Sequence, residues 1–341
     1  MKKYKEYAPV VIPTLSRWNH LERCIDSLRQ NELSEFTELY IGLDYPPNES
    51  YMEGYEKVKA YLENGIDGFL NVNVFVHSKN MGPGGNLDFL RAEVKKKYTR
   101  FIETEDDNEF APSFLSYIND CLEKYEADDS VVAVAGYNYP IDTSDFAGNT
   151  YYDDCYFAAF GFGTWVDKFQ TMRDTITYEE FWRFYKNRQM MSRFCKYYPN
   201  QYCNMVKAAL GYGMQVIRGN DIWKMDMTYG LYMFSHNKKM IYPTISKVRN
   251  WGYDGSGENC DEIVCDTTKK VTHRNFSFEC QQLDLQKWSG EIVLTENISY
   301  DNIARRLDSY FEIPVVELYK VKAAYYISRI IGVDRARKLL T

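Results

Sequence analysis

Short apolar runs alternate with amphipathic stretches over the first 140 residues of the chain. Five runs have the length and composition of strands, and they cover residues 8–13, 38–43, 71–77, 99–104 and 131–136. Four stretches between them repeat apolar residues at helical spacing, over residues 18–30, 50–62, 86–98 and 112–125. Alternation at this spacing predicts parallel βαβ units. We therefore expect an α/β protein with a doubly wound, mostly parallel sheet and helices on both faces.

Beyond residue 140 the pattern changes to aromatic-rich loops and helices. Helical spacing returns near 178–210 and again near 300–340. The 341 residues contain no internal repeat and no long Pro- or Ser-rich linker. One domain with a C-terminal extension is therefore favoured over two independent domains.

Polar residues follow several of the expected strands. Ligands of doubly wound sheets bind beyond the carboxyl ends of the strands, which draws attention to segments 13–16, 77–85 and 103–109 and to Asp44. One of these segments holds five carboxylates within seven positions: Glu103, Glu105, Asp106, Asp107 and Glu109. Like charges this close repel one another by roughly 1 kcal/mol per adjacent pair in water.

Two interpretations of this acidic segment compete. It is either a solvated turn before a helix, where the helix dipole favours Asp and Glu, or a place that holds a divalent cation. Mg²⁺ and Mn²⁺ take oxygen ligands and are commonly held by one or two carboxylates plus substrate phosphates. The position at a strand end and the apolar flanks favour the cation.

Composition narrows the class of partner. A net charge of −7 argues against nucleic-acid binding, which needs a basic face. The chain has no apolar run of 18 residues and its first residues lack an apolar segment of signal-peptide length, so a cytoplasmic protein is expected. The eight scattered cysteines fit reduced thiols, and Cys260 and Cys265 lack the companions of a zinc site.

The acidic segment carries a family resemblance. EDDNEFAPSF, residues 105–114, resembles the "EDDxExAPxF" signature of the N-acetylglucosaminyltransferase I group and of related bacterial nucleotide-sugar glycosyltransferases of GT-A fold. Further motifs of these enzymes follow in the same order: VVIPT at 10–14 with Arg17, Asp44, Asn80-Met-Gly82, FGFGTW at 160–165 and NWGYDGSG at 250–257. Any one of them is weak, but the ordered set is specific and covers roughly residues 8 to 260.

The resemblance implies roles for these residues. Asp107 is expected to ligate Mn²⁺ or Mg²⁺, while Glu105 and Asp106 orient ribose or sugar hydroxyls. The remaining donor-binding residues are expected to be Pro13, Thr14 and Arg17 beside the uridine, Asp44 at the uracil, Asn80 and Gly82 near the ribose and diphosphate, and Trp165 under a sugar. A core position for Trp165 and a plain turn at Gly82–Gly85 are the alternatives, and Glu103 and Glu109 are expected to be outer or solvated groups.

An inverting transfer also needs a base within hydrogen-bond reach of the acceptor hydroxyl. The family carries a carboxylate in a segment such as "S-W-D-Y-x-W", which residues 222–229 resemble, so Asp226 is the expected catalytic base. Met225 departs from that pattern because Trp is usual at its position. Asp221 is a nearby competitor.

Together these features predict an inverting, metal-dependent glycosyltransferase, a hexosyl- or N-acetylhexosaminyltransferase. It is expected to use a nucleotide sugar, UDP-linked, and a saccharide acceptor, lipid-linked in some bacterial enzymes of this kind, in glycan, capsule or other surface-polysaccharide assembly. The alternatives are a non-catalytic nucleotide- or glycan-binding module and a sugar nucleotidyltransferase. We expect a catalytic domain over 1–265, with a nucleotide-binding half at 1–140 and an acceptor half at 141–265, and a helical extension over 266–341.

The last segment, 314–340, mixes apolar and basic residues at helical spacing. Packing of this segment on the catalytic domain is the default expectation. Peripheral contact with the inner face of a membrane is the alternative.

Overall fold

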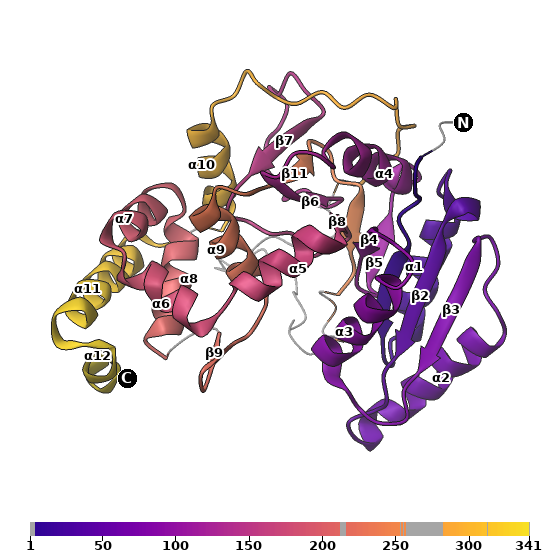
Figure 1. Ribbon diagram of the computed structural model, residues 1–341, viewed down its shortest axis with the longest axis horizontal. Helices are drawn as coiled ribbons and strands as arrows, with labels where there is room; N and C mark the ends of the chain where they lie inside the picture. The colour runs from indigo at the N-terminus through magenta and orange to yellow at the C-terminus, as the bar shows by residue number, and fades with distance from the viewer. Residues whose placement is uncertain are drawn as a thin grey trace, which may run out of the picture.

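The computed structural model of the protein describes residues 4–211, 216–252, 254, 256, 282–311 and 313–340. Within them the centre is an eight-stranded sheet (Figure 1). Its strands, in sheet order, are β3 (Asn71–Val76), β2 (Glu38–Leu43), β1 (Val10–Thr14), β4 (Arg100–Glu103), β8 (Phe162–Trp165), β6 (Val131–Ala135), β11 (Lys239–Pro243) and β7 (Thr150–Asp153).

Strand directions confirm the mostly parallel sheet. The first four strands of the order are parallel neighbours, and β11 runs parallel to β6. β8 is antiparallel to both of its neighbours, and β7 closes the sheet antiparallel to β11. The continuous apolar runs of β1 and β2 reflect this position, since nearly every residue of both strands is buried. At the edge, β3 is only partly covered, and Asn71, Val74 and Val76 are exposed.

Helices cover both faces of the sheet, as expected. The register aligns Gly163, Ile102, Val10 and Leu39 on one face, and a Cβ on Gly163 would lie 2.5 Å from Ile118 of the helix α4 (Phe114–Lys124). Gly42 is three residues beyond Leu39 and therefore faces the other side. There a Cβ would lie 2.1 Å from Oδ1 of Asn86, in α3 (Gly82–Val94).

The remaining helices of the first half are α1 (Trp18–Arg29), α2 (Met52–Glu63) and the 3₁₀ turns η1 (Ser34–Phe36) and η2 (Glu49–Tyr51). The sequence placed the helices close to their observed bounds, except for α3. The Gly-rich turn expected before Asn86 is the first turn of α3 itself. Pro83 is accepted there because an N–H in the first turn has no helical partner.

The second half consists mainly of helices. They are α5 (Val166–Thr175), α6 (Tyr178–Lys186), α7 (Arg188–Tyr197), α8 (Pro199–Ala209), α9 (Asp226–His236), α10 (Tyr300–Tyr310), α11 (Val315–Ile331) and α12 (Val333–Leu340). Two small antiparallel pairs complete the described strands: β9 (Ile217–Arg218) with β10 (Asp221–Ile222), and β5 (Asn108–Phe110) with β12 (Val248–Asn250). In this described part of the chain, no helix has the length and apolar character needed to cross a bilayer.

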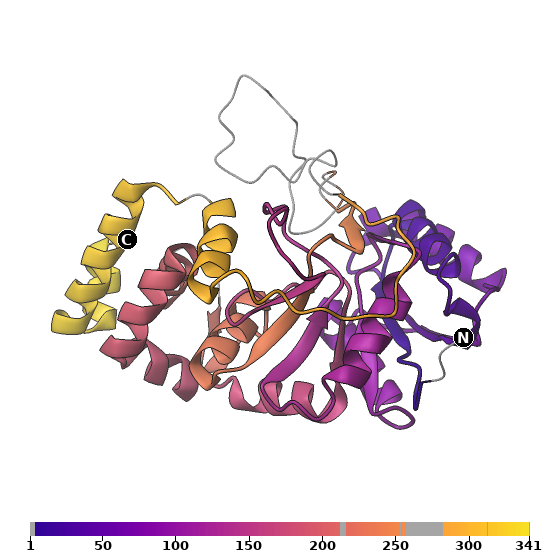
Figure 2. The same ribbon diagram turned by 90° about the horizontal axis from the view of Figure 1, so that it is seen from above.

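The C-terminal helices pack against the rest of the chain, and Figure 2 shows them gathered at one end of the molecule. Before them, residues 284–297 run back along the body, where Trp288 Nε1 donates to Asp120 Oδ2 of α4 at 2.7 Å. Tyr156 donates to Asp308 of α10 at 2.9 Å, and Tyr185 shares a hydrogen bond of 2.7 Å with Ser328 of α11. The expected packing of residues 314–340 on the rest of the chain is confirmed.

The expected boundary at residue 265 lies outside the described residues, as do Cys260, Cys265 and Cys280. Cys24, Cys121, Cys155, Cys195 and Cys203 are free thiols, as expected.

Gly230 gives a test of the packing between α9 and the segment that follows β7. A Cβ at this position would lie 1.7 Å from the carbonyl oxygen of Cys155. Although Gly→Ala within a helix ordinarily stabilises by about 1 kcal/mol, we expect Gly230→Ala to lower the free energy of unfolding by about 1–3 kcal/mol. Urea denaturation measures the change. Gly84→Ala, in α3 with open space around the new methyl group, is the control and should not destabilise; equal midpoints for the two variants would contradict the packing.

Candidate functional site

The loop after β1 and the acidic segment after β4 are joined by direct contacts. The register pairs Val11 with Glu103, so both segments leave the sheet at the same edge. Thr14 Oγ1 donates to Asp106 Oδ2 at 2.7 Å. Arg17 binds Asp106 Oδ1 through one guanidinium nitrogen and Asp107 Oδ2 through another, the latter at 2.8 Å. The structure thus brings together four of the residues expected at the site.

Asp107 is held from its other side by the second half of the chain. Its Oδ1 accepts a hydrogen bond from Asn250 Nδ2 at 2.7 Å, and its carbonyl accepts one from Trp251 N at 2.8 Å. These contacts exist because β12 pairs with β5 directly after the acidic segment. Gly252 is required here, since a Cβ would lie 2.3 Å from Asp107 Oδ2.

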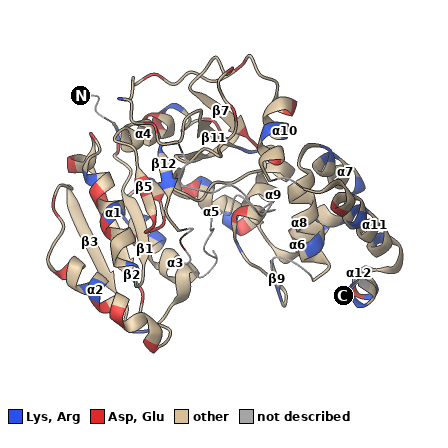
Figure 3. Cartoon of the chain, turned by 180° about the vertical axis from the view of Figure 1, so that it is seen from behind, with Lys and Arg blue, Asp and Glu red and all other residues tan. Residues whose placement is uncertain are grey.

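The acidic segment carries more negative charge than its surroundings neutralise. Asp106 and Asp107 are buried, whereas Glu105 retains exposed surface. Burial raises the pKa of Asp106, opposed by Arg17 and reinforced by Asp107. Crowding by protein atoms also raises the pKa of Glu105 well above its usual value, and the charges of Asp107 and Asp226 add to this. Figure 3 shows the acidic residues near β5.

Glu103 and Glu109 have other partners. Glu103 is 6% exposed and forms a two-point ion pair with Arg91 of α3, at 2.7 and 2.6 Å. Of the two expectations for Glu103, an outer or a solvated group, the solvated one is wrong, because Arg91 allows the charge to be buried. Glu109 is half-buried and accepts a hydrogen bond from Trp251 Nε1 at 2.8 Å.

The ends of β2 and β3 form a second part of the site. Asp44 Oδ1 accepts hydrogen bonds from the backbone of Tyr45 and Met81, at 2.9 and 2.8 Å, so Asp44 ties the two loops together. Asn80 Nδ2 donates to Tyr45 O at 2.7 Å. Gly82 has φ +70°, with open space where a Cβ would lie, and α3 begins there. Pro13, half-buried in β1, pairs with Gly42 of β2.

Trp165 lies away from these loops, which corrects its expected place under the donor sugar. Phe162 of β8 pairs with Glu103, but Trp165 pairs with Arg100 at the opposite end of β4. Three residues of a strand span about 10 Å. Trp165 is 3% exposed, and the Lys168 ammonium lies 4.0 Å from its ring centre. It is a core residue because β8 runs antiparallel to β4.

Asp226 is the first residue of α9. It retains solvent-exposed surface, but the protein atoms crowded around its carboxylate raise its pKa to about 7, with a further contribution from the charge of Glu103. The influence of Asp226 on Glu105 places the two carboxylates within electrostatic reach of each other. Asp221 is exposed on the β9–β10 hairpin.

Sequence reasoning missed three residues of this region. Asn250 opens the motif at 250–257 and was given no role, although its motif was the available signal. Arg91 has no sequence signal, since only the fold places α3 beside Glu103. Trp223 is 41% exposed three residues before Asp226, with the Arg218 guanidinium 3.3 Å from its ring centre.

The carboxylate oxygens of the acidic segment suit a cation that also binds substrate. In the described part of the chain, no group of three or more Asp, Glu, His or Cys side chains is placed to hold a metal ion by itself. Mg²⁺ and Mn²⁺ commonly bind one or two carboxylates plus phosphates, and Asp107 and Glu105 supply such oxygens amid excess negative charge. Asp107 Oδ2 already accepts from Arg17, so a cation there would share this oxygen with the guanidinium or displace it.

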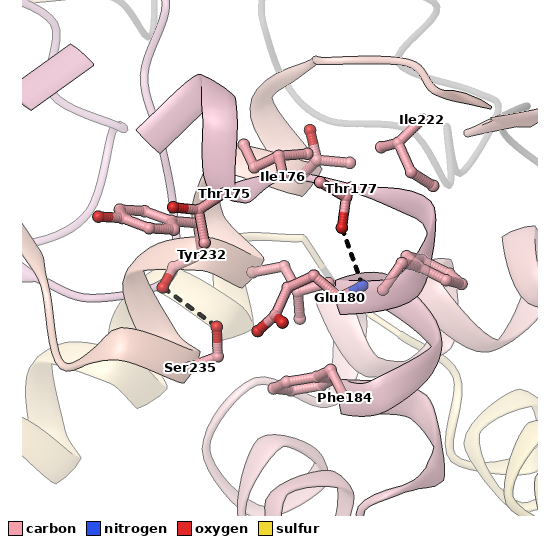
Figure 4. A pocket seen from close by; sticks show the side chains of 11 residues that line it. Thr175, Ile176, Thr177, Glu180, Phe184, Ile222, Tyr232 and Ser235 are labelled. Atoms are coloured by element: carbon pink, nitrogen blue, oxygen red, sulfur yellow. Dashed lines mark hydrogen bonds between the residues drawn. The ribbon is translucent and has the colours of Figure 1, made fainter. Parts of the chain in front are cut away.

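A nearby cavity is not the substrate site. It lies between α6, α9 and β10 and is lined by residues that include Ile176, Phe184, Ile222 and Tyr232 (Figure 4). Its volume of about 20 Å³ holds about one water. A sugar does not fit.

The chain belongs to glycosyl transferase family 2. The model of this family matches residues 10–195, more than half of the 341 residues, and the match includes β1, Arg17 and the acidic segment. Together with the doubly wound sheet, it confirms the expected GT-A fold. The particular similarity to the N-acetylglucosaminyltransferase I group stays a prediction.

Several solved structures are similar to parts of the chain. The mannosyltransferase PcManGT from Pyrobaculum calidifontis, in complex with GDP-Man and Mn²⁺, has 15% identity and a TM-score of 0.33, with 48% of each chain covered. S. aureus TarS 1-349 has 12% identity and a TM-score of 0.34, covering 49% of this chain and 48% of its own. Mouse xyloside xylosyltransferase 1 has 10% identity and a TM-score of 0.29, covering 48% and 68%. The chain thus spans about half the length of the mannosyltransferase chain and of the TarS 1-349 chain. No curated protein matches it in sequence.

The buried ion pair beneath the site gives a stability test. Arg91→Met leaves Glu103 charged, buried and without its partner, so we expect the free energy of unfolding to fall by about 3–5 kcal/mol. Replacing both partners, as Arg91→Met with Glu103→Leu, removes the uncompensated charge and should recover much of that loss. Urea denaturation of the two variants measures this difference. A double variant no more stable than the single one would show that charge burial is not the cause.

Proposed function

We propose that the protein is an inverting, divalent-cation-dependent glycosyltransferase that moves a sugar from a nucleotide sugar, UDP-linked, to a saccharide acceptor. The observation that carries this proposal is the junction of Thr14, Arg17, Asp106 and Asp107 at the carboxyl ends of β1 and β4. Membership of glycosyl transferase family 2 supports it. A role in assembling bacterial surface glycans is part of the proposal.

The donor is proposed to bind along the loops that follow β1, β2, β3 and β4. Asp44 fixes the loop of Asn80 and Gly82, where the nucleoside is expected, and Asp106 is held by Thr14 and Arg17 in position to accept from donor hydroxyls. Asp107 and the accessible Glu105 would hold the cation, which supplies charge compensation for the diphosphate leaving group. Arg17, if the cation displaces it from Asp107, would be available to bind a phosphate oxygen.

Asp226 is proposed to take the proton of the acceptor hydroxyl. A base works best when its pKa lies near the working pH, and crowding brings the pKa of Asp226 to about 7. The first turn of a helix fixes its backbone, and its solvent-exposed surface admits an acceptor. The uncovered face of Trp223, three residues earlier, suits packing against a sugar ring.

Loss of the proposed metal ligand should abolish turnover. Asp107→Ala is expected to lower the metal-dependent release of UDP by ~10²-fold or more, because the leaving group loses the protein ligand of its cation. The donor is chosen first by a thermal-shift screen of nucleotide sugars with and without Mn²⁺, since ligands of the native state raise the unfolding temperature. Glu109→Gln, outside the junction, is the control. Survival of both activity and metal requirement in Asp107→Ala would refute the assignment.

Removal of the proposed base should slow the chemical step alone. Asp226→Asn is expected to lower kcat by ~10²–10⁴-fold while donor affinity stays near wild type. Asp221→Asn, on the exposed hairpin, is the matched control and should keep a near-normal kcat. The reverse pattern would move the base to Asp221.

The pH profile tests the same residue independently. An Asp base is active when ionised, so kcat of the wild type should fall about tenfold per pH unit below about pH 7 and level off above it. The residual activity of Asp226→Asn should lack this acidic limb. Its persistence in that variant would assign the titration to another group.

A further inference from the structure

The helix α11 lies at the surface and carries apolar residues on more than one side. Its sequence, VVELYKVKAAYYISRII, places them around the helix among four charged residues, Glu317, Lys320, Lys322 and Arg329. Only one side is enclosed: Val321, Ala324, Tyr325 and Ser328 are buried, and Ser328 bonds Tyr185 of α6 at 2.7 Å. The opposite side therefore needs an explanation.

That opposite side is an exposed apolar stripe. Its members are Val315 (68% exposed), Val316 (66%), Tyr319 (66%), Tyr326 (58%), Ile327 (39%) and Ile330 (79%). At 3.6 residues per turn they fall within roughly 120° of the helix circumference and extend over about 25 Å. Leu339 of the following helix α12 is also 72% exposed. Exposed apolar groups in such a continuous row mark an interaction surface.

The stripe lies in a basic part of the chain. Residues 313–341 contain six Lys and Arg and two acidic residues, although the whole chain carries a net charge of −7. Both acids have basic partners, Glu317 with Lys207 at 2.7 Å and Asp334 with Arg337 at 3.5 Å. Lys320 and Lys338 are exposed. Figure 3 shows the Lys and Arg residues on α11 and α12.

We propose that the outward face of α11, with α12, binds a lipid surface rich in anionic headgroups. The apolar stripe would lie in the boundary between headgroups and acyl chains, and the lysines would contact the headgroup charges. Charge complementarity selects this occupant, because a second copy of the chain would bring a basic face against a basic face. The helix lies along the membrane rather than across it.

The geometry of the molecule suits this contact. α11 and α12 lie at the end of the molecule farthest from β3 (Figures 1 and 2). Their inner side is fixed by α6 and α8, where Arg337 donates to the Ala209 carbonyl at 2.7 Å. The face is thus presented by a packed unit of helices. This inference goes beyond the sugar transfer and does not depend on it.

Co-sedimentation of the 341-residue chain with vesicles tests the proposal. Wild-type protein should bind vesicles of phosphatidylcholine and phosphatidylglycerol, bind vesicles of phosphatidylcholine alone much more weakly, and be released by salt. Ile330→Ser combined with Lys338→Glu should weaken binding to the anionic vesicles by roughly tenfold or more. Both positions are exposed, so the variant should keep the wild-type unfolding temperature.

Leu285→Ser combined with Lys287→Glu is the matched control. Leu285 is 75% exposed, and the Lys287 side chain is 83% exposed, but both lie outside the C-terminal helices; vesicle binding should be unchanged. Equal loss in the control, or no binding of the wild type to anionic vesicles, would overturn the proposal. A dimer in solution that Ile330→Ser dissociates would assign the face to a second copy and overturn it as well.

Discussion

The ion pairs of Arg17 with Asp106 and Asp107 are the interaction on which the candidate site depends. Two buried carboxylates next to each other repel strongly, and a charge of opposite sign is needed to keep both at the edge of the sheet. Arg17 lies in the turn between β1 and α1. Its ion pairs therefore also hold this turn beside the loop that follows β4. Glu105 is crowded by protein atoms and lies near Asp107 and Asp226, so its pKa is raised, and its ionisation would add charge that one guanidinium does not balance. This remaining imbalance is the physical reason for expecting a cation with the substrate.

The site is completed by elements far apart in the chain. Asn250 reaches Asp107 only because β12 pairs with β5, and Asp226 approaches Glu105 only because α9 packs beside the sheet. Beneath them, Arg91 and Glu103 attach α3 to β4 through a buried ion pair. The second half of the chain thus supplies the proposed base and the residues that cover the acidic segment. The first half supplies the acidic segment itself.

The abundance of tyrosine has a structural explanation. Many of the 30 Tyr are buried, and a few of the hydroxyl groups donate to buried or half-buried carboxylates. Tyr198 donates to Asp153 at 2.7 Å and Tyr300 to Asp154 at 2.5 Å. Burial and the charge of Asp154 raise the pKa of Asp153 to about 7. These contacts join β7, α7–α8 and α10, so these tyrosines serve the core.

The sequence alone determined the strand–helix order of the first half and the position of the acidic segment, since apolar period and strand ends are local properties. It also placed Thr14, Arg17, Asp106 and Asp107 at one edge, because parallel strands share that edge. Only the tertiary structure decided the features that depend on strand direction and on contacts between residues far apart in the chain. The antiparallel course of β8 took Trp165 to the opposite edge, Arg91 allowed Glu103 to be buried, and Pro83 became part of α3. It also decided that one side of α11 stays open, because periodicity gives the apolar sides of a helix but not which of them the rest of the chain covers.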